Sequence, residues 1–190
     1  MRVMLFCLVL CGTAARAAEY YVATNGANSN PGTLVQPWLT LQKAASTLVA
    51  GDTVYIRGGW YPQASRIEPS ASGNAAGSVT NWITYAAYPG ESAVLDGSSL
   101  SFSWGGLVYI RPARGFLRVC GLMISNSPFA AIAVIGAQHV IVESNITVNT
   151  GSSGVYLQYA TNIVVRANHV RRACYARSQE CISVAEDSYN

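Results

Sequence analysis

Residues 131–145 (AIAVIGAQHVIVESN) and 154–168 (GVYLQYATNIVVRAN) decide the fold of this chain, because the second repeats the pattern of the first 23 positions later. Aliphatic residues alternate along both stretches, which is typical of strands with one buried face. Such a period indicates a solenoid, in which each coil buries its apolar face only against the next coil. We therefore predict an all-β solenoid. The matched pairs are Ile132/Val155, Val134/Leu157, Ala137/Ala160, Val140/Ile163, Val142/Val165 and Asn145/Asn168.

The repeat continues on both sides of these two coils. Strand patterns occur upstream at 82–85, 93–95, 107–110, 116–119 and 122–124. Downstream, residues 181–184 repeat the pattern of Val155 and Leu157 at an offset of 27, which places four extra residues in a polar loop around 175–180. Insertions into a repeat tend to lie on one face and often carry function. A tolerated surface loop explains the insertion equally well.

The region before the coils predicts a different, capping unit. Residues 20–22 and 52–57 have strand patterns, and residues 40–49 (TLQKAASTLV) have apolar positions at helical spacing. Thr40 is a suitable N-cap and Gly51 a suitable stop, so we expect an amphipathic helix at about 40–50. Such a helix would cover the open end of a stack of coils, which otherwise exposes apolar side chains and strand edges.

Asn145 and Asn168 occupy the same turn of successive coils. Asparagine side chains can bond to the backbone, and asparagine tolerates the left-handed conformation of a sharp corner. We interpret the pair as a structural ladder, in preference to reading Asn145-Ile146-Thr147 as a glycosylation sequon.

The first 17 residues have the features of a secretory signal peptide. A basic start at Arg2 precedes the apolar run VMLFCLVLC, and Ala15-Arg16-Ala17 is a small-x-small cleavage site. The run is too short to span a membrane. We therefore predict a secreted protein, extracellular or periplasmic, with a signal peptide at 1–17, a cap at 18–60 and coils at 61–190.

Charge excludes a nucleic-acid-binding role. Removing Arg2 and Arg16 lowers the basic count from 12 to 10, against 9 acidic residues, so the mature domain is nearly neutral. It lacks the basic field that such binding requires. The low charged fraction, 11%, suits an exported β protein that meets neutral or uronic glycans.

The cap and first coils resemble a known family. The stretches YYVATNGANSNPGTLVQPWLTLQKAASTLVAGDTVYIRGGWY (20–61) and ITYAAYPGESAVLDG (83–97) are similar to the N-terminal part of exported right-handed parallel β-helix proteins, the pectate lyases of polysaccharide lyase family 9 among them. The resemblance implies a right-handed parallel β-helix that is pectate lyase-like. It implies an acidic polysaccharide as partner and cleavage of uronate polymers by β-elimination. We expect a complete chain to be a monomer. A fold does not by itself settle function.

The family chemistry needs a calcium ion held by several aspartates and a lysine or arginine base. This sequence supplies no such set. Lys43 is the only lysine and lies on the cap helix, and Glu143 is the only acid between 116 and 177. Glu180, Glu186 and Asp187 form the one acidic cluster. Calcium is therefore expected from the resemblance alone, no catalytic residue is assigned in this chain, and the resemblance places the catalytic residues in coils beyond residue 190.

Arg171, Arg172 and Glu180 are the candidate substrate-binding residues. With Arg166 and Arg177 the arginines would form a basic stripe that meets carboxylates, if stacking aligns them. Solvated surface arginines and a solvated loop acid are the plainer interpretation. The tryptophans at 60, 82 and 104 either stack on sugar rings or seal the core, and the second role is commoner.

Cys174 and Cys181 flank the polar loop, and in an oxidising compartment a disulfide between them would staple it. Cys120 has the context of a buried thiol. The sequence stops at Asn190 immediately after a strand pattern, so we expect a truncated solenoid. Two functions fit: a polysaccharide lyase-like protein, or a non-catalytic adhesion or glycan-binding module. An inactive N-terminal fragment of a lyase is a third possibility.

Overall fold

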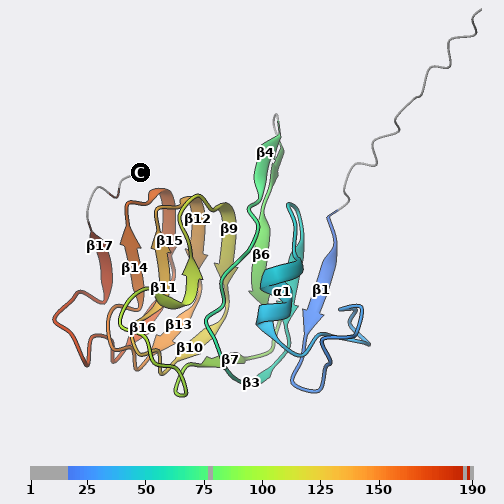
Figure 1. Cartoon of the computed structure of the whole chain (residues 1–190), viewed down its shortest axis with the longest axis horizontal. Coiled ribbons are helices and arrows are strands. Elements are labelled where there is room, and N and C mark those ends of the chain that lie inside the picture. The colour runs from blue at the N-terminus through green and yellow to red at the C-terminus, as the bar shows by residue number, and fades with distance from the viewer. Residues whose placement is uncertain (1–16, 77–78, 186–187, 189–190) are drawn as a thin grey trace, which may run out of the picture.

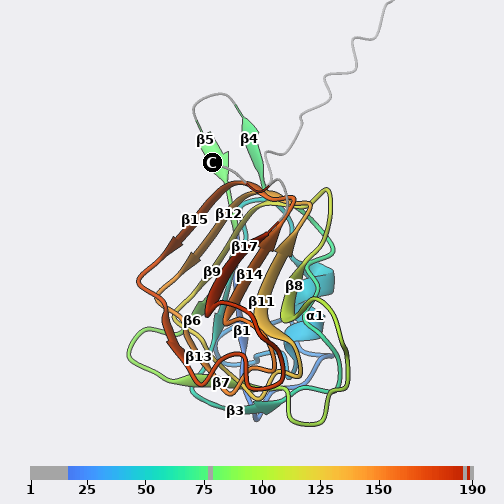
Figure 2. The ribbon, with the colours of Figure 1, turned by 90° about the vertical axis from the view of Figure 1, so that its left-hand side faces the viewer.

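The computed structural model describes residues 17–76, 79–185 and 188 (Figure 1). The predicted signal peptide, apart from Ala17, lies outside the described residues, as do Glu186 and Asp187. Within the described part, the chain winds through three parallel sheets in turn, which form the three sides of a prism seen end-on in Figure 2. A short antiparallel hairpin, β4 (Asn74–Ala76) and β5 (Val79–Asn81), projects from it.

Each sheet takes one strand from each successive coil, so strands that are neighbours in a sheet lie one coil apart in sequence. The first sheet comprises β1 (Glu19–Val22), β2 (Thr53–Ile56), β6 (Ile83–Ala87), β9 (Gly115–Cys120), β12 (Gln138–Glu143) and β15 (Thr161–Arg166). The second comprises β3 (Gly59–Pro62), β7 (Ala93–Asp96), β10 (Met123–Ser125), β13 (Ile146–Val148) and β16 (His169–Arg171). The third comprises β8 (Gly106–Ile110), β11 (Ala130–Ile135), β14 (Val155–Gln158) and β17 (Ile182–Ala185).

The 23-residue register predicted from the sequence is confirmed. Val142 pairs directly with Val165, and Ile132 with Val155, in parallel strands. Alternate residues point inward, and their side chains stack into one hydrophobic column that runs through the coils. The offset of 27 at Ile182 is also confirmed, because Ile182 pairs with Val155 and the extra residues lie in the loop 172–181.

The predicted helix is present but shorter than expected. Helix α1 (Leu41–Thr47) begins after Thr40, whose hydroxyl accepts a hydrogen bond from the Lys43 amide. It buries Leu41, Ala44 and Ala45 in the same core as the strands. The helix stops before Gly51, because the Asp52 carboxylate accepts a hydrogen bond from the Val49 amide and turns the chain into β2.

The asparagine ladder is present, but the left-handed corner lies one residue earlier than predicted. Ser144 and Ala167 have positive φ angles of 56° and 53°, while Asn145 and Asn168 do not. The asparagines instead supply hydrogen bonds: Asn145 Nδ2 donates to Asn168 Oδ1, and the Asn168 carboxamide oxygen also accepts from the Asn145 amide. The conformational strain and the side-chain bonding therefore fall on adjacent residues.

Left-handed corners recur with the same 23-residue period at other points of the coil. Most of these positions carry residues other than glycine, although glycine adopts this conformation most easily. Contacts with neighbouring coils fix these corners, which holds residues there that would avoid this conformation in isolation. The columns are Ala113/Gly136/Tyr159, Phe116/His139/Asn162, Gly121/Ser144/Ala167 and Asn126/Asn149/Arg172.

Candidate functional site

The loops that connect the second sheet to the third define a groove. In the middle coils these loops are short, residues 126–129 and 149–154, whereas the flanking loops, 97–105 and 172–181, are longer. The backbone of 149–154 packs directly on 126–129, and a Cβ on Gly151 would lie only 2.2 Å from the Pro128 carbonyl oxygen. The two short loops form the floor and the two long loops form the walls.

The groove has a volume of about 630 Å³ and mixed polar and apolar surfaces. This is within the range of ligand-binding clefts, about 300–1,000 Å³. Arg172 and Tyr175 from the last loop are exposed, and Tyr175 has 65% of its surface accessible. The residues that line it are Gly97, Ser98, Leu100, Asn126, Pro128, Asn149, Arg172 and Tyr175.

A polar ladder runs along the floor. Asn149 Nδ2 donates to Asn126 Oδ1 at 3.2 Å, and Asn126 Nδ2 donates to Asp96 Oδ1 at 2.7 Å. Asp96 Oδ2 also accepts from the Ser98 hydroxyl, so this buried carboxylate is fully engaged. Arg172 follows Asn149 in the same column, with a φ of 49°, and places a cation at the end of the ladder.

Two arginines hold the long loop 97–105 against the outer face of the third sheet. The Arg177 guanidinium lies 3.5 Å from the Ser103 carbonyl oxygen and 4.9 Å from the centre of the Phe129 ring. Arg66 donates to the Trp104 carbonyl oxygen and lies 4.0 Å from the Phe102 ring centre. The contact between Arg177 and Ser103 joins the two walls of the groove. Arg177 therefore has a structural role, whereas the Arg172 side chain makes no such contact with the described residues.

The sequence-predicted binding residues separate in the structure. Arg172 lines the groove, whereas Arg171, at the end of β16, does not. Glu180 does not line it either, because its Oε2 accepts a hydrogen bond from the Ser183 hydroxyl at 3.1 Å. Arg166 lies on the first sheet and pairs with Glu143, so the four arginines do not form a single stripe.

The cysteines are free thiols in the structure, so the predicted Cys174–Cys181 disulfide is not formed there. Cys174 Sγ lies 3.5 Å from the Glu180 carbonyl oxygen instead. Burial, and then the neighbouring Cys181, raise the pKa of the Cys174 thiol. Pairing in an oxidising compartment stays a prediction. Cys120 is half-buried rather than fully buried as expected, and burial raises the pKa of its thiol.

Glu143 joins three coils through ion pairs on the first sheet. Its buried carboxylate contacts Arg118 from the preceding coil and Arg166 from the following coil, the latter at 2.6 Å. Burial by itself raises the pKa of Glu143, but the hydrogen bonds from Arg166 and Arg118 outweigh it, so the pKa lies below its ordinary value of 4.5. Glu143 therefore acts as a structural link and is unsuited to a role as a proton donor.

Replacing Glu143 by glutamine should lower the free energy of unfolding by about 1–2 kcal/mol at about pH 7, since charge-assisted hydrogen bonds are lost but both arginines reach solvent. Because the folded-state pKa is depressed, this stabilisation is present above the ordinary pKa of 4.5 and is lost as the pH falls through the folded-state value. Urea unfolding at neutral and acidic pH measures this stabilisation.

Glu68→Gln is the control variant, because it breaks the more exposed Glu68–Arg111 pair. Its change in the free energy of unfolding should be near zero. A Glu143→Gln deficit that persists unchanged in acid would contradict this account.

The acidic side chains of the described residues do not gather into a cluster of the kind that holds calcium. Among them, no group of three or more histidine, cysteine, aspartate or glutamate side chains lies close enough together to hold a metal ion. Asp96, an acid in contact with the groove residues, already bonds to Ser98 and Asn126. No catalytic step is therefore assigned to a metal within the described part of the chain.

The sequence interpretation missed most of the groove. Asn126, Asn149 and Arg172 follow one another at intervals of 23 residues, a spacing that the sequence shows once the repeat is extended into the loops. Tyr175 carries no sequence signal beyond its place in the insertion. Trp60 and Trp104 were expected to seal the core, but they are 55% and 46% exposed, and Trp38 is the buried tryptophan.

Parallel sheets of matched coils around one hydrophobic column define a solenoid of the β-helix class. The chain belongs to the family described as Pel9A-like, right-handed β-helix region, whose model matches residues 20–180. This confirms the right-handed parallel β-helix and the pectate lyase-like resemblance predicted from the sequence.

Individual relatives agree with this assignment. The chain is 30% identical over 131 residues to "Pectate lyase PEL9" of Emericella nidulans, covering 63% of this chain and 31% of the relative. It is 27% identical over 152 residues to "Uncharacterized protein YwoF" of Bacillus subtilis, covering 80% of this chain and 28% of the relative. The chain thus spans less than a third of either relative.

Among solved structures, the lacto-N-biosidase of glycoside hydrolase family 136 from Eubacterium ramulus superposes with a TM-score of 0.67 at 17% identity, over 82% of this chain and 34% of that one. At this identity the likeness concerns the fold alone. Across the described residues, none of the helices is both long and apolar enough to cross a membrane.

Proposed function

We propose that this chain belongs to an exported polysaccharide lyase-like protein and that its groove binds an acidic polysaccharide. The carrying observation is the position of Arg172 at the end of the Asn126–Asn149 ladder, in a groove of about 630 Å³. A guanidinium pairs with a uronate carboxylate through two parallel hydrogen bonds. Neighbouring carboxamides and the Tyr175 ring supply the polar contacts and the flat apolar surface that a sugar ring uses.

Cleavage by β-elimination is the second part of the proposal, and it is supported by the family and by the relative named as a pectate lyase. It is tested by following the absorbance of unsaturated uronides with polygalacturonate and alginate, with and without added calcium. Product from either polymer supports a lyase. No product from any uronate polymer refutes cleavage.

Glycan binding without cleavage is the competing function. It is favoured by the lack of a metal-binding cluster among the described residues. Binding of oligogalacturonate with no unsaturated product, whether or not calcium is present, would support this alternative.

Replacing Arg172 by asparagine should weaken binding of tetragalacturonate about 10- to 100-fold, the value of one or two charge-assisted hydrogen bonds. Asparagine is chosen because Arg172 has a left-handed backbone, which asparagine tolerates, and because asparagine already occupies the two preceding positions of the column. Isothermal titration calorimetry gives the affinity.

Arg171→Asn is the matched control, since it removes the same charge from the adjacent residue outside the groove. We expect it to change the affinity by less than about twofold. Equal weakening in both variants would mean that general charge, not the groove, attracts the ligand.

A further inference from the structure

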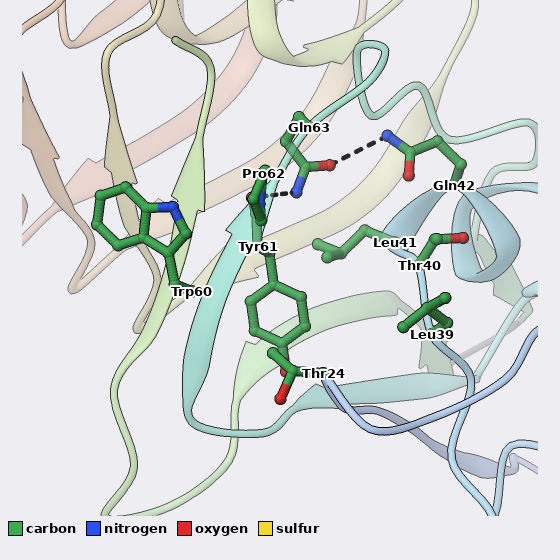
Figure 3. Close-up of a pocket in the computed structure, with 9 residues that line it drawn as sticks. All are labelled: Thr24, Leu39, Thr40, Leu41, Gln42, Trp60, Tyr61, Pro62 and Gln63. Carbon is green, nitrogen blue, oxygen red and sulfur yellow. Dashed lines mark hydrogen bonds between the residues drawn. The ribbon is translucent and has the colours of Figure 1, made fainter. Parts of the chain in front are cut away.

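A second cavity lies at the other end of the solenoid, between helix α1 and strand β3. It has a volume of about 260 Å³ and shares no residue with the groove. Figure 3 shows Trp60 of β3 at one edge of the cavity and Gln42 of α1 at the opposite edge, together with Leu39 just before the helix. Tyr61 of β3 and Gln63, just after this strand, lie between them. The volume is below that of most clefts for drug-sized ligands, so it fits a single small unit.

Trp60 is the cavity residue whose large aromatic side chain is most exposed. It is 55% exposed, and within the described part of the chain no aromatic ring or cation packs against its indole. The other exposed tryptophan, Trp104, meets the Tyr109 ring at 5.5 Å, and the buried Trp38 stacks on Tyr20 at 4.6 Å. An exposed indole without a partner offers a flat apolar surface to the C–H face of a sugar ring.

A fixed carboxamide, that of Gln42, lines the side of the cavity opposite Trp60 (Figure 3). Gln42 Nε2 donates to Gln63 Oε1 at 3.0 Å and to the Ser65 carbonyl oxygen at 2.9 Å. Both partners are acceptors, so the orientation of the Gln42 amide group is determined. Gln63 is buried and is held in turn by its own donation to the Tyr61 carbonyl oxygen. Gln42 Oε1 has no partner among the described residues and is left to accept a hydroxyl.

The cavity carries no charge. Its lining residues include no acid, arginine, lysine or histidine. Tyr61 is the one ionisable side chain, and burial, followed by the charge of Glu91, raises its pKa to about 12, so the phenol stays neutral. The Tyr61 hydroxyl is already bonded to the Arg57 carbonyl oxygen at 2.8 Å. A cavity of this kind has nothing to offset the desolvation of a carboxylate.

We propose that this cavity is a second carbohydrate site, which binds one neutral sugar unit between the Trp60 indole and the Gln42 carboxamide. It goes beyond the proposed function, because its ligand differs in charge from that of the groove. Together the two sites would let one chain contact acidic and neutral parts of a polysaccharide.

The test uses tetramers of galactose, arabinose, xylose and glucose as neutral probes and tetragalacturonate as the acidic probe. Titration calorimetry is run on the wild type and on Trp60→Ala, Trp60→Phe, Trp104→Ala and Arg172→Asn. We expect at least one neutral tetramer to bind with an affinity that is insensitive to salt. Trp60→Ala should weaken this binding about tenfold or more, Trp60→Phe should weaken it less, and Trp104→Ala should leave it unchanged.

The two sites can fail independently. Trp60→Ala should leave tetragalacturonate binding intact, and Arg172→Asn should leave neutral-tetramer binding intact. The neutral site is refuted if no neutral tetramer binds, or if Trp60→Ala binds the tetramer as well as the wild type does. It is also refuted if the wild type self-associates in analytical ultracentrifugation and Trp60→Ala abolishes this, since the indole would then be a contact between two copies of the chain. Loss of the acidic site alone would leave this inference standing.

Discussion

Replacing Asn145 by alanine is expected to lower the free energy of unfolding by about 2–4 kcal/mol, because it leaves buried polar groups without partners. The side chain is 1% exposed and makes three hydrogen bonds. Its Oδ1 accepts from the Leu122 amide at 3.1 Å, and its Nδ2 donates to the Val119 carbonyl oxygen and to Asn168 Oδ1, both at 3.0 Å. Urea unfolding should show a lower midpoint with an unchanged slope.

Asn168→Ala is the matched control at the next rung of the same ladder. Asn168 is only half-buried, so water can replace part of what its side chain supplies, and we expect a loss of about 1 kcal/mol. Equal losses at the two rungs would mean that burial does not set the value of these hydrogen bonds.

Replacing Ile132 by alanine is expected to cost about 3–4 kcal/mol, within the usual range for a buried aliphatic residue cut back to alanine. Ile132 is fully buried and pairs with Val108 on one side and Val155 on the other, so the coils above and below cannot close the cavity. The measurement is again the midpoint of urea unfolding.

Ile182→Ala provides the comparison, because it is the same residue type two coils along the same column. Ile182 is 41% exposed and pairs with Val155 on one side, with no strand beyond it among the described residues. We expect a loss below about 1 kcal/mol. A larger effect at Ile182 than at Ile132 would contradict the view that stacking from both sides holds the core.

The candidate groove was predictable only in part. Arg172 was a candidate because a stacked solenoid brings arginines near one another, and the insertion at 175–180 indicated a special loop. The sequence did not separate Arg172 from Arg171, since adjacent residues differ only in the direction that their side chains take after the corner. It raised Trp60, Trp82 and Trp104 equally as sugar-stacking or core residues and favoured the core, because the exposure of each ring depends on what the neighbouring coil leaves uncovered.

The amino-acid sequence by itself determined the coil period, the inward-facing aliphatic residues and the asparagine rungs, because each depends on alternation and spacing along the chain. Tertiary structure alone decided where the corners bend, which arginine faces the groove, and where the helix stops. Those outcomes depend on contacts between coils: Ser144 and Ala167 take left-handed angles because the stack holds them there, and Asp52 ends α1 by binding the Val49 amide. A short-range pattern cannot specify such contacts, since their partners come from other turns of the solenoid.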